Sequence, residues 1–370
     1  MNLTHIQYID KTKGMQALGM YVADETRSPK QSPLYDLHQA LGAVFVVFGD
    51  ALWVDYYGNN LQNEYLQLNT AVAVCDISQV TLLSVTGPDV LRSIGPWFTN
   101  PKTAPREAGS MLYGGFVRDG RLMDDGMIFV VSNHELLITV NLDRTEFMEI
   151  FDDQFRAAYQ VTDLTDRYVK LQIQGPQADQ LLQEHFKLEP LPFFHFRGVD
   201  DLLIANCGFT LPGGYELYLP VEKGRRYWQE LIAAGVTPYG ISVMEISRVE
   251  ALKICHGQEF GAGIFSPAEI GLTDGVQERR IRLAYCVSDL LREDREPVLP
   301  EIGQLLLGKE GATCGILTSF VFSPYYDRYV GFCHLERELP DYTELCCNGF
   351  NLRVVGLDEA RKLLHHLPQP

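Results

Sequence analysis

Positive charge is scarce in this chain of 370 residues, which carries 31 Lys and Arg against 48 Asp and Glu and has a formal net charge of −17. Nucleic acids and anionic membrane surfaces are bound through clustered Lys and Arg, so the composition argues against both as main partners. A local basic pocket for a small anion remains compatible with it. We therefore expect a small-molecule substrate, whereas the sequence does not identify a protein partner.

Long apolar runs are missing as well. No stretch reaches the roughly 18 residues of a membrane span, and the first ten residues lack a basic region followed by an apolar core. Hydrophobic residues make up 46% of the chain and charged residues 21%, which is typical of a soluble globular protein. We expect a cytoplasmic protein with room for two or three domains.

Metal and nucleotide motifs are absent from the sequence. The eight cysteines form no CxxC pair and have no His at metal-ligand spacing, so we expect no metal site and favour free buried thiols. There is no Walker loop, no GxGxxG after a strand and no HExxH. Nucleotide-binding and zinc-protease functions are therefore set aside.

The sequence does contain a weak internal repeat. Residues 83–92 and 171–180 both read as a strand, a Gly-Pro turn and an amphipathic helix, which predicts two similar α+β units. Between them, a three-stranded meander is predicted over 111–117, 127–131 and 136–140.

Further elements follow the same kind of pattern. One helix is predicted over 143–155, with Phe147, Ile150 and Phe151 on its apolar side. Two more are predicted over 227–234, after a turn at 220–224, and over 243–253. The last part of the chain changes to short strands that predict a small β-barrel or sandwich, at 280–287, 315–321, 329–335 and 352–355.

Glu216 is a single carboxylate inside the apolar strand predicted over 215–219, which follows a Gly-Gly turn. An unpaired carboxylate is costly to bury, so Glu216 should have a partner. A structural salt bridge, an exposed strand face and a ligand-binding role all remain open from the residues alone.

Asp124 and Asp125 stand between apolar residues at the start of the second meander strand. They are either turn and cap residues or a carboxylate held against an apolar wall, where it can act as an acid, a base or a stabiliser of positive charge. Strand alternation predicts that Asp125 faces the core if Met123 does. Asn141 ends the third strand and either caps the next helix or contacts a ligand.

Two histidines have less specific surroundings. His195, in Phe193-Phe-His-Phe196, is expected to line the core, with the edge of a ligand pocket as the alternative. His256 has no Asp or Ser around it that completes a triad, so a structural or solvent-facing role is favoured.

About ten short motifs follow one another in a defined order. They are Ser32 to Gly42, Cys75-Asp-Ile-Ser78, Val85-Thr-Gly-Pro88, Met123-Asp-Asp125, Val140-Asn141, Ile173-Gln-Gly-Pro176, Gly214-Tyr-Glu-Leu-Tyr-Leu219, Arg248-Val-Glu-Ala251, Gly257-Gln-Glu259, Ser266-Pro267 and Thr318 to Pro324. Each motif is weak alone, but their order is specific. From about Ser32 to the C-terminus the chain therefore resembles the glycine-cleavage aminomethyltransferase (T-protein) superfamily.

The resemblance implies an α+β fold, a three-domain cloverleaf around a tetrahydrofolate pocket. The implied domains are 1–80 with 167–275, which carries the folate-site Glu, then 81–166, which carries the folate-site Asp and Asn, and a C-terminal β-barrel-like domain over 279–370. Within this frame, the catalytic carboxylate falls on Asp125. The implied folate-binding residues are Glu216, Tyr113, Asn141 and Phe209.

Several positions depart from the T-protein pattern. An Arg of the T-proteins is replaced by Met244, a His by Gln79, and a Gly-Trp-Glu-Met-Pro stretch by Gly49-Asp-Ala-Leu-Trp53. The segment around Glu216 and the one around His195 are more similar to relatives that demethylate small molecules onto tetrahydrofolate. We therefore expect Met244, Gln79, Trp53 and His195 to shape the substrate side of the pocket.

The resulting hypothesis is a tetrahydrofolate-dependent one-carbon transferase that moves a methyl group from a small molecule to tetrahydrofolate. Three alternatives remain open. They are a relative recruited to a different, folate-independent reaction, a glycine-cleavage aminomethyltransferase, and a non-catalytic folate-binding protein of iron–sulfur assembly. The iron–sulfur-assembly alternative rests on a partial match between that branch's Lys-Gly-Cys-Tyr-x-Gly-Gln motif and Lys253-Ile-Cys-His-Gly-Gln258.

Overall fold

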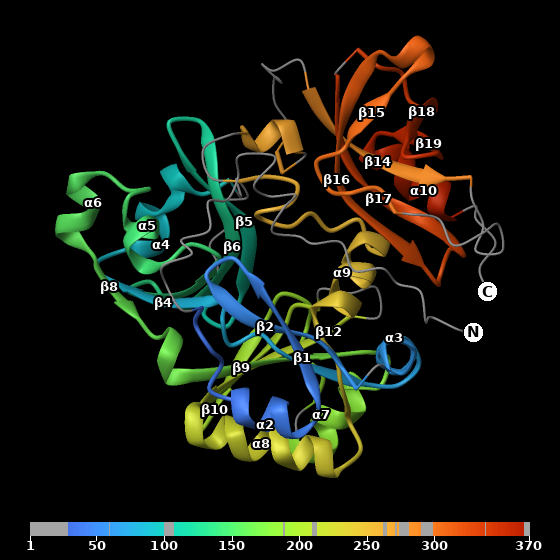
Figure 1. The fold of residues 1–370 in the computed structure, drawn as a ribbon. Helices are drawn as coiled ribbons and strands as arrows, with labels where there is room; N and C mark the ends of the chain where they lie inside the picture. The colour runs from blue at the N-terminus through green and yellow to red at the C-terminus, as the bar shows by residue number, and fades with distance from the viewer. Residues whose placement is uncertain are drawn as a thin grey trace. The chain divides into compact units, whose positions relative to one another are not determined.

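The described chain separates into two units. A computed structural model describes residues 29–58, 60–99, 107–187, 189–208, 213–261, 265–270, 272–273, 281–289, 299–336 and 338–365. One unit is Arg27–Met244 and the other includes Glu245–Pro370 (Figure 1). The boundary between them falls within one helix, α9 (Ile241–Glu250).

A six-stranded sheet lies in the first unit, with the order β10-β11-β12-β9-β3-β13. Its pairs are antiparallel except β13 with β3, which run parallel. The strands are β3 (Ala73–Asp76), β9 (Tyr168–Gln174), β10 (Phe196–Val199), β11 (Leu202–Asn206), β12 (Gly214–Pro220) and β13 (Thr237–Pro238). Strand β12 confirms the prediction made around Glu216.

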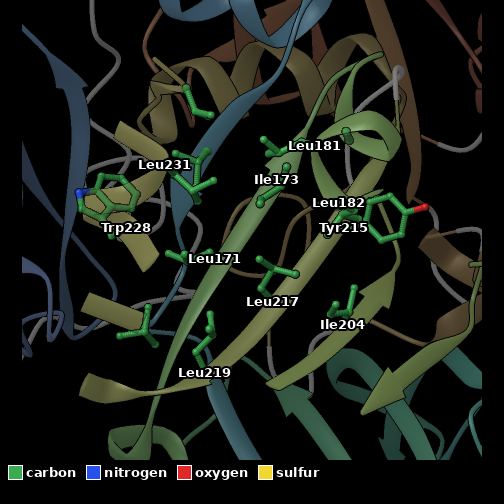
Figure 2. Close-up of a cluster of buried hydrophobic side chains, with 14 of the residues drawn as sticks. Leu171, Ile173, Leu181, Leu182, Ile204, Tyr215, Leu217, Leu219, Trp228 and Leu231 are labelled. Carbon is green, nitrogen blue, oxygen red and sulfur yellow. The ribbon is translucent and has the colours of Figure 1, made fainter. Parts of the chain in front are cut away.

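One face of this sheet is apolar and covered by helices. Leu171, Ile173 and Leu217 lie on that face, where Trp228 and Leu231 of α8 (Val221–Ala233) pack against them (Figure 2). Burying an alternating set of aliphatic side chains under amphipathic helices is the main stabilising term for such a layer. The nearby helices are α2 (Tyr35–Ala40), α3 (Leu61–Thr70) and α7 (Ala178–Phe186).

A five-stranded sheet belongs to the same unit, with the order β5-β6-β7-β4-β8. Its strands are β4 (Thr81–Thr86), β5 (Met111–Arg118), β6 (Arg121–Ser132), β7 (Glu135–Val140) and β8 (Gln160–Asp163). The predicted meander is therefore confirmed as β5, β6 and β7. Its covering elements are α4 (Val90–Ser93), η1 (Gly95–Trp97), α5 (Arg144–Met148), α6 (Asp153–Ala158) and η2 (Thr165–Arg167).

A two-stranded sheet completes the first unit and consists of β1 (Ala43–Phe48) and β2 (Ala51–Tyr57). The internal repeat is confirmed at the level of single strand–turn–helix segments. The strand before each Gly-Pro pair is followed by a helix, as β4 by α4 and β9 by α7, but β4 and β9 lie in different sheets.

The second unit contains a closed barrel with the order β14-β17-β16-β15-β18-β19. The strands are β14 (Ile281–Ser288), β15 (Leu305–Leu307), β16 (Thr313–Ser323), β17 (Arg328–Glu336), β18 (Thr343–Cys347) and β19 (Phe350–Val355), and η3 (Pro267–Ile270), η4 (Lys309–Gly311) and α10 (Leu357–His365) accompany them. The C-terminal barrel is therefore confirmed. The sequence missed β15 and β18, because each is short and partly exposed.

Two helix predictions were wrong in extent. The single helix over 143–155 is broken into α5 and α6, because Asp143 and Asp152 each accept a backbone N–H and start a helix of their own. The turn at 220–224 is instead the first turn of α8, where Gly224 lets the helix approach Val169 of β9. The three-domain division stays a prediction.

Among the described helices, none combines the length and the apolar character needed to cross a membrane. All eight cysteines are free of disulfide bonds, and five of them are buried. This arrangement agrees with the expected set of free thiols.

Candidate functional site

Asp125 lies in β6, where it is partly buried and accepts hydrogen bonds at both carboxylate oxygens. Tyr113 Oη donates to Asp125 Oδ2 at 2.8 Å, and Asn141 Nδ2 donates to Asp125 Oδ1 at 3.1 Å. Tyr113 is on β5 and Asn141 follows β7, so the meander brings three predicted residues together from three neighbouring strands.

The buried member of the acidic pair is Asp124 rather than Asp125. Leu122 and Asp124 are both 0% exposed, whereas Met123 and Asp125 are only partly buried. Met123 packs against the buried cluster that contains Phe116, yet Asp125 does not follow it into that core. The β5–β6 register pairs Phe116 with Asp124 and Val117 with Leu122, so it skips Met123 and interrupts strict alternation there. Asp125 is consequently the more exposed of the two carboxylates.

Asn141 is not a helix cap. Asp143 fills that role for α5, with its carboxylate accepting from Glu146 N at 2.9 Å in a capping box. The exposed Asn141 side chain instead donates to Asp124 Oδ1 at 2.8 Å as well as to Asp125. The helix-cap interpretation of Asn141 was therefore wrong.

Glu216 lies on the face of β12 opposite the aliphatic cluster. Tyr218 Oη donates to Glu216 Oε2 at 2.6 Å, and Gln172 Nε2 on the neighbouring β9 donates to Oε1 at 3.4 Å. Burial raises the pKa of Glu216, although these two hydrogen bonds partly offset the effect. Its partners are thus the Tyr218 phenol, the Gln172 amide and the Cys207 thiol, in a partly buried position.

A buried lysine shares this face of the sheet. Lys170 pairs with Tyr218 in the ladder, is 0% exposed and donates from Nζ to the Val80 carbonyl. Burial lowers the pKa of Lys170 to about 8, against the opposing attraction of nearby carboxylates that include Glu216. In its charged form, Lys170 favours the ionised form of Glu216.

The face that carries Glu216 and the face that carries Asp125 are turned toward each other. Tyr218 contacts Phe129 of β6 edge-to-face with ring centroids 5.4 Å apart, and both belong to one buried cluster with Leu82, Met111 and Ala205. Phe129 is four residues after Asp125, so alternation puts both on one face of β6. The two candidate carboxylates therefore belong to facing sides of the two sheets.

Trp53 and Gln79 are brought close to each other through β2. Gln79 Nε2 donates to the carbonyl of Leu52 at 2.8 Å, and Trp53 Nε1 donates to Phe48 O at 3.2 Å. The buried Gln79 Oε1 has no hydrogen-bond partner among the described residues, so it offers an acceptor to a donor group.

The remaining predicted residues are less informative. His195 is exposed, with Nδ1 3.1 Å from Phe193 O, so the expectation that it lines the core was wrong. Met244 is partly buried in α9. Phe209 lies outside the described residues. The pocket roles of His195, Met244 and Phe209 stay predictions.

Sequence reasoning missed Asp124, Tyr218, Gln172 and Lys170 as neighbours of the predicted residues. A signal for three of them was available, because polar or hydroxyl-bearing side chains recur at alternate positions of β9 and β12. That pattern shows a polar row on one face of a sheet but not which strands are adjacent.

A cavity of about 200 Å³ lies beside the buried cluster that contains Phe129 and Tyr218. Neither Asp125 nor Glu216 lines it. Phe129 and Tyr218 form part of its wall, and Asp200 and Asp201 also line it. Tyr218 therefore contacts Glu216 through its hydroxyl and borders the cavity.

Comparison with known proteins assigns the chain to a family. The family model of the GCVT N-terminal domain matches residues 34–279. The chain belongs to the GCVT family. An aminomethyltransferase from Desulforamulus reducens (strain ATCC BAA-1160 / DSM 100696 / MI-1) is 26% identical to this GCVT-family chain over 340 residues, covering 84% of this chain and 91% of that protein.

A solved structure has the same fold as this GCVT-family chain. The crystal structure of the glycine cleavage system aminomethyltransferase T from Bartonella henselae superimposes with a TM-score of 0.78 and 23% identity, covering 89% of this chain and 98% of that one. The resemblance drawn from the ordered motifs is thereby confirmed for family and fold. Membership in an aminomethyltransferase family points to a transferase.

Proposed function

We propose that this protein is a tetrahydrofolate-dependent one-carbon transferase that moves a methyl group from a small molecule to tetrahydrofolate. The observation that carries the proposal is Glu216, a partly buried strand carboxylate whose ionisation is opposed by burial. A pterin ring presents an amino group and a ring N–H side by side. A charge-assisted pair of hydrogen bonds to those donors would stabilise the ionised carboxylate.

The donors around Glu216 leave room for such a ligand. A carboxylate has about four acceptor positions. Tyr218 and Gln172 occupy one on each oxygen, and the Cys207 thiol also interacts with the carboxylate. Lys170 adds a positive charge on the same face of the sheet. These features fit the recognition of a planar ligand with two adjacent N–H donors.

Asp125 is assigned the catalytic role. Tetrahydrofolate would supply the nitrogen lone pair that bonds to the methyl carbon, while the carbon–heteroatom bond of the donor breaks, the demethylated product leaves with that electron pair and the accepting nitrogen then releases its proton. Asp125, oriented by Tyr113 and Asn141, stabilises the positive charge that develops on the accepting nitrogen. The facing walls of the two sheets hold donor and acceptor in line and exclude water, which accelerates a transfer between two bound molecules.

The proposal of a methyl donor rests on the side chains that we expect on the substrate side of the pocket. Met244 and Gln79 replace the charged or imidazole groups of the T-proteins, and Gln79 leaves a buried acceptor oxygen near Trp53. A free small molecule with an apolar body fits those side chains. Aminomethyl transfer of the glycine-cleavage type is the second candidate, supported by the similarity to an aminomethyltransferase over most of the chain.

The first experiment is a calorimetric titration of the purified protein with tetrahydrofolate. We expect binding to the wild-type chain and a loss of affinity of about tenfold or more in Glu216→Gln, because an amide presents only one acceptor to the paired donors. Glu189→Gln, a change of an exposed glutamate in the same unit, is the matched control. Equal affinity in wild type and Glu216→Gln would contradict the pocket assignment, and absence of binding would favour a folate-independent reaction.

A second experiment separates the two transfer reactions. Sulfonium compounds, methyl ethers and methylamines with a labelled methyl carbon are supplied with tetrahydrofolate, and labelled methyltetrahydrofolate is sought by mass spectrometry. Methylenetetrahydrofolate with ammonia and a carrier protein in its reduced dihydrolipoyl form tests the aminomethyl reaction in reverse. Turnover only in the second assay would replace methyl transfer by the glycine-cleavage reaction.

A further inference from the structure

Beneath Asp125, the carboxylate of Asp124 is completely enclosed. Asp124 is 0% exposed and stands opposite Phe116, also 0% exposed, in the β5–β6 ladder. Phe116 contacts Phe147 of α5 edge-to-face at 5.1 Å between ring centroids. An apolar wall therefore surrounds a group that requires polar partners.

Four N–H groups supply those partners. Asp124 Oδ1 accepts from Asp125 N and from Asn141 Nδ2, both at 2.8 Å. Asp124 Oδ2 accepts from Asn141 N at 2.8 Å and from Leu142 N at 2.9 Å. Since a carboxylate offers about four acceptor positions, Asp124 has none left for a ligand.

Three of the four donors belong to residues of the candidate site. One is the backbone N–H of Asp125, and two belong to Asn141, whose side-chain amide also donates to Asp125 Oδ1 at 3.1 Å. Asn141 itself is exposed, so little besides these hydrogen bonds restrains its side chain. Asp124 thus fixes the amide that orients the Asp125 carboxylate.

The strands also approach closely at this point. A Cβ atom on Gly126, the residue after Asp125, would lie 2.0 Å from the Thr139 carbonyl oxygen of β7. The absence of a side chain at position 126 lets β6 and β7 lie close enough for Asp124 to reach the backbone beyond the end of β7.

We propose that Asp124 is the positioning residue of the site, which holds Asn141 and Asp125 in their mutual arrangement without touching the substrate. The inference rests on the proposed function for the meaning of that arrangement. It assigns the two adjacent aspartates different tasks, with Asp125 contacting the ligand and Asp124 acting through Asn141.

The test uses Asp124→Asn in the full-length protein, because the substitution keeps the size of the side chain and turns one acceptor oxygen into a donor. We expect the backbone amides of Asn141 and Leu142 to exchange hydrogen about tenfold faster or more, and the side-chain amide resonances of Asn141 to move toward those of a free amide. Asp125→Asn is the control, since it removes a neighbouring carboxylate but keeps the acceptors of those backbone amides. Unchanged exchange and resonances in Asp124→Asn would overturn the proposal.

A double-mutant cycle on tetrahydrofolate affinity then shows whether Asp124 acts through Asn141. We expect Asp124→Asn to weaken binding about tenfold, and to weaken it by less than about threefold when Asn141→Ala is already present. Additive effects would mean that Asp124 merely supports the fold and would overturn the proposal. If Asp124→Asn does not fold, Asp124→Ser keeps an acceptor and takes its place. If wild-type protein binds no tetrahydrofolate, the proposed function fails, while the exchange and resonance measurements still decide the role of Asp124.

Discussion

At the scale of single residues, two neutral donors orient Asp125. Tyr113 and Asn141 donate to its two oxygens and supply no positive charge. These two hydrogen bonds fix the direction of the carboxylate, whereas the proposed mechanism uses its charge. This separates its orientation from its electrostatic role, and the two can be tested independently.

We expect Asp125→Asn to lower turnover by about 100-fold or more while tetrahydrofolate affinity changes by less than about threefold, because the amide keeps the shape but not the charge that stabilises the transition state. The turnover is measured with whichever donor is active in the labelled-methyl assay. Asp119→Asn, in the exposed turn of the same β5–β6 hairpin, should leave both quantities unchanged. Unchanged turnover in Asp125→Asn would remove the residue from the mechanism.

The sequence singled out Glu216 and the pair Asp124 and Asp125 because a carboxylate among apolar strand residues is unusual, and the family resemblance then pointed to Asp125. It could not choose which aspartate of the pair is enclosed, since alternation only says that Asp124 and Asp125 point in opposite directions. The choice follows from Leu122 and Phe116, which pack on the Asp124 side. It likewise could not supply Gln172 as a partner of Glu216, because only the strand register joins β9 to β12.

At the scale of elements, Glu64 of α3 joins three parts of the first unit. Its carboxylate accepts from Tyr57 N at the end of β2 at 2.6 Å and from Gly240 N just before α9 at 3.0 Å. Burial raises the pKa of Glu64 to about 7, and these two backbone hydrogen bonds only partly oppose the effect. Glu64 is 2% exposed, so its charge has little contact with water.

This pKa predicts how stability depends on pH. Below about pH 4.5 Glu64 is protonated in both the folded and the unfolded chain. Between that pH and about 7 the folded chain binds more protons than the unfolded chain. The free energy of unfolding therefore falls as the pH rises through this window. Over that window we expect wild type to lose about 3 kcal/mol relative to Glu64→Gln. Urea denaturation of both proteins at a series of pH values measures the difference. Parallel curves would contradict the assignment.

The boundary between α5 and α6 shows what hydrophobic periodicity does not predict. The apolar spacing of Phe147, Ile150 and Phe151 suggested one helix, and all three residues are indeed buried. Asp152 nevertheless accepts from Phe155 N at 2.8 Å and restarts the helix there. Local side-chain hydrogen bonds decided the boundary, whereas hydrophobic periodicity had decided the buried face.

At the scale of the whole molecule, the unit that contains the barrel holds a buried arginine, Arg248, that pairs with two carboxylates. Arg248 of α9 is 1% exposed, and its guanidinium donates to Glu245 Oε1 and Oε2 at 2.7 Å each and to Glu259 Oε2 at 2.9 Å. It also lies 5.7 Å from the ring centre of Phe332 in β17. This network ties the end of α9 and the segment around Glu259 to the barrel.

We expect Arg248→Met to destabilise the unit Glu245–Pro370 by about 3–5 kcal/mol, because it leaves two buried carboxylates without their cation. Hydrogen exchange followed by mass spectrometry should show faster exchange in β16 and β17. Arg361→Met, which changes an exposed arginine of α10 in the same unit, is the control and should have little effect. Unaltered exchange in the barrel strands would show that the network does not stabilise the unit.

The sequence by itself determined the class of fold, the barrel at the C-terminal end and the candidate residues Asp125 and Glu216, because alternation, turn residues and motif order are properties of the chain. Only the tertiary structure decided which side chains meet. Asn141 became a partner of both aspartates rather than a helix cap, and Tyr218 became the link between Glu216 and Phe129. Hydrogen bonds and ring contacts between distant segments depend on strand register and on the packing of one sheet against another, which local sequence patterns do not encode.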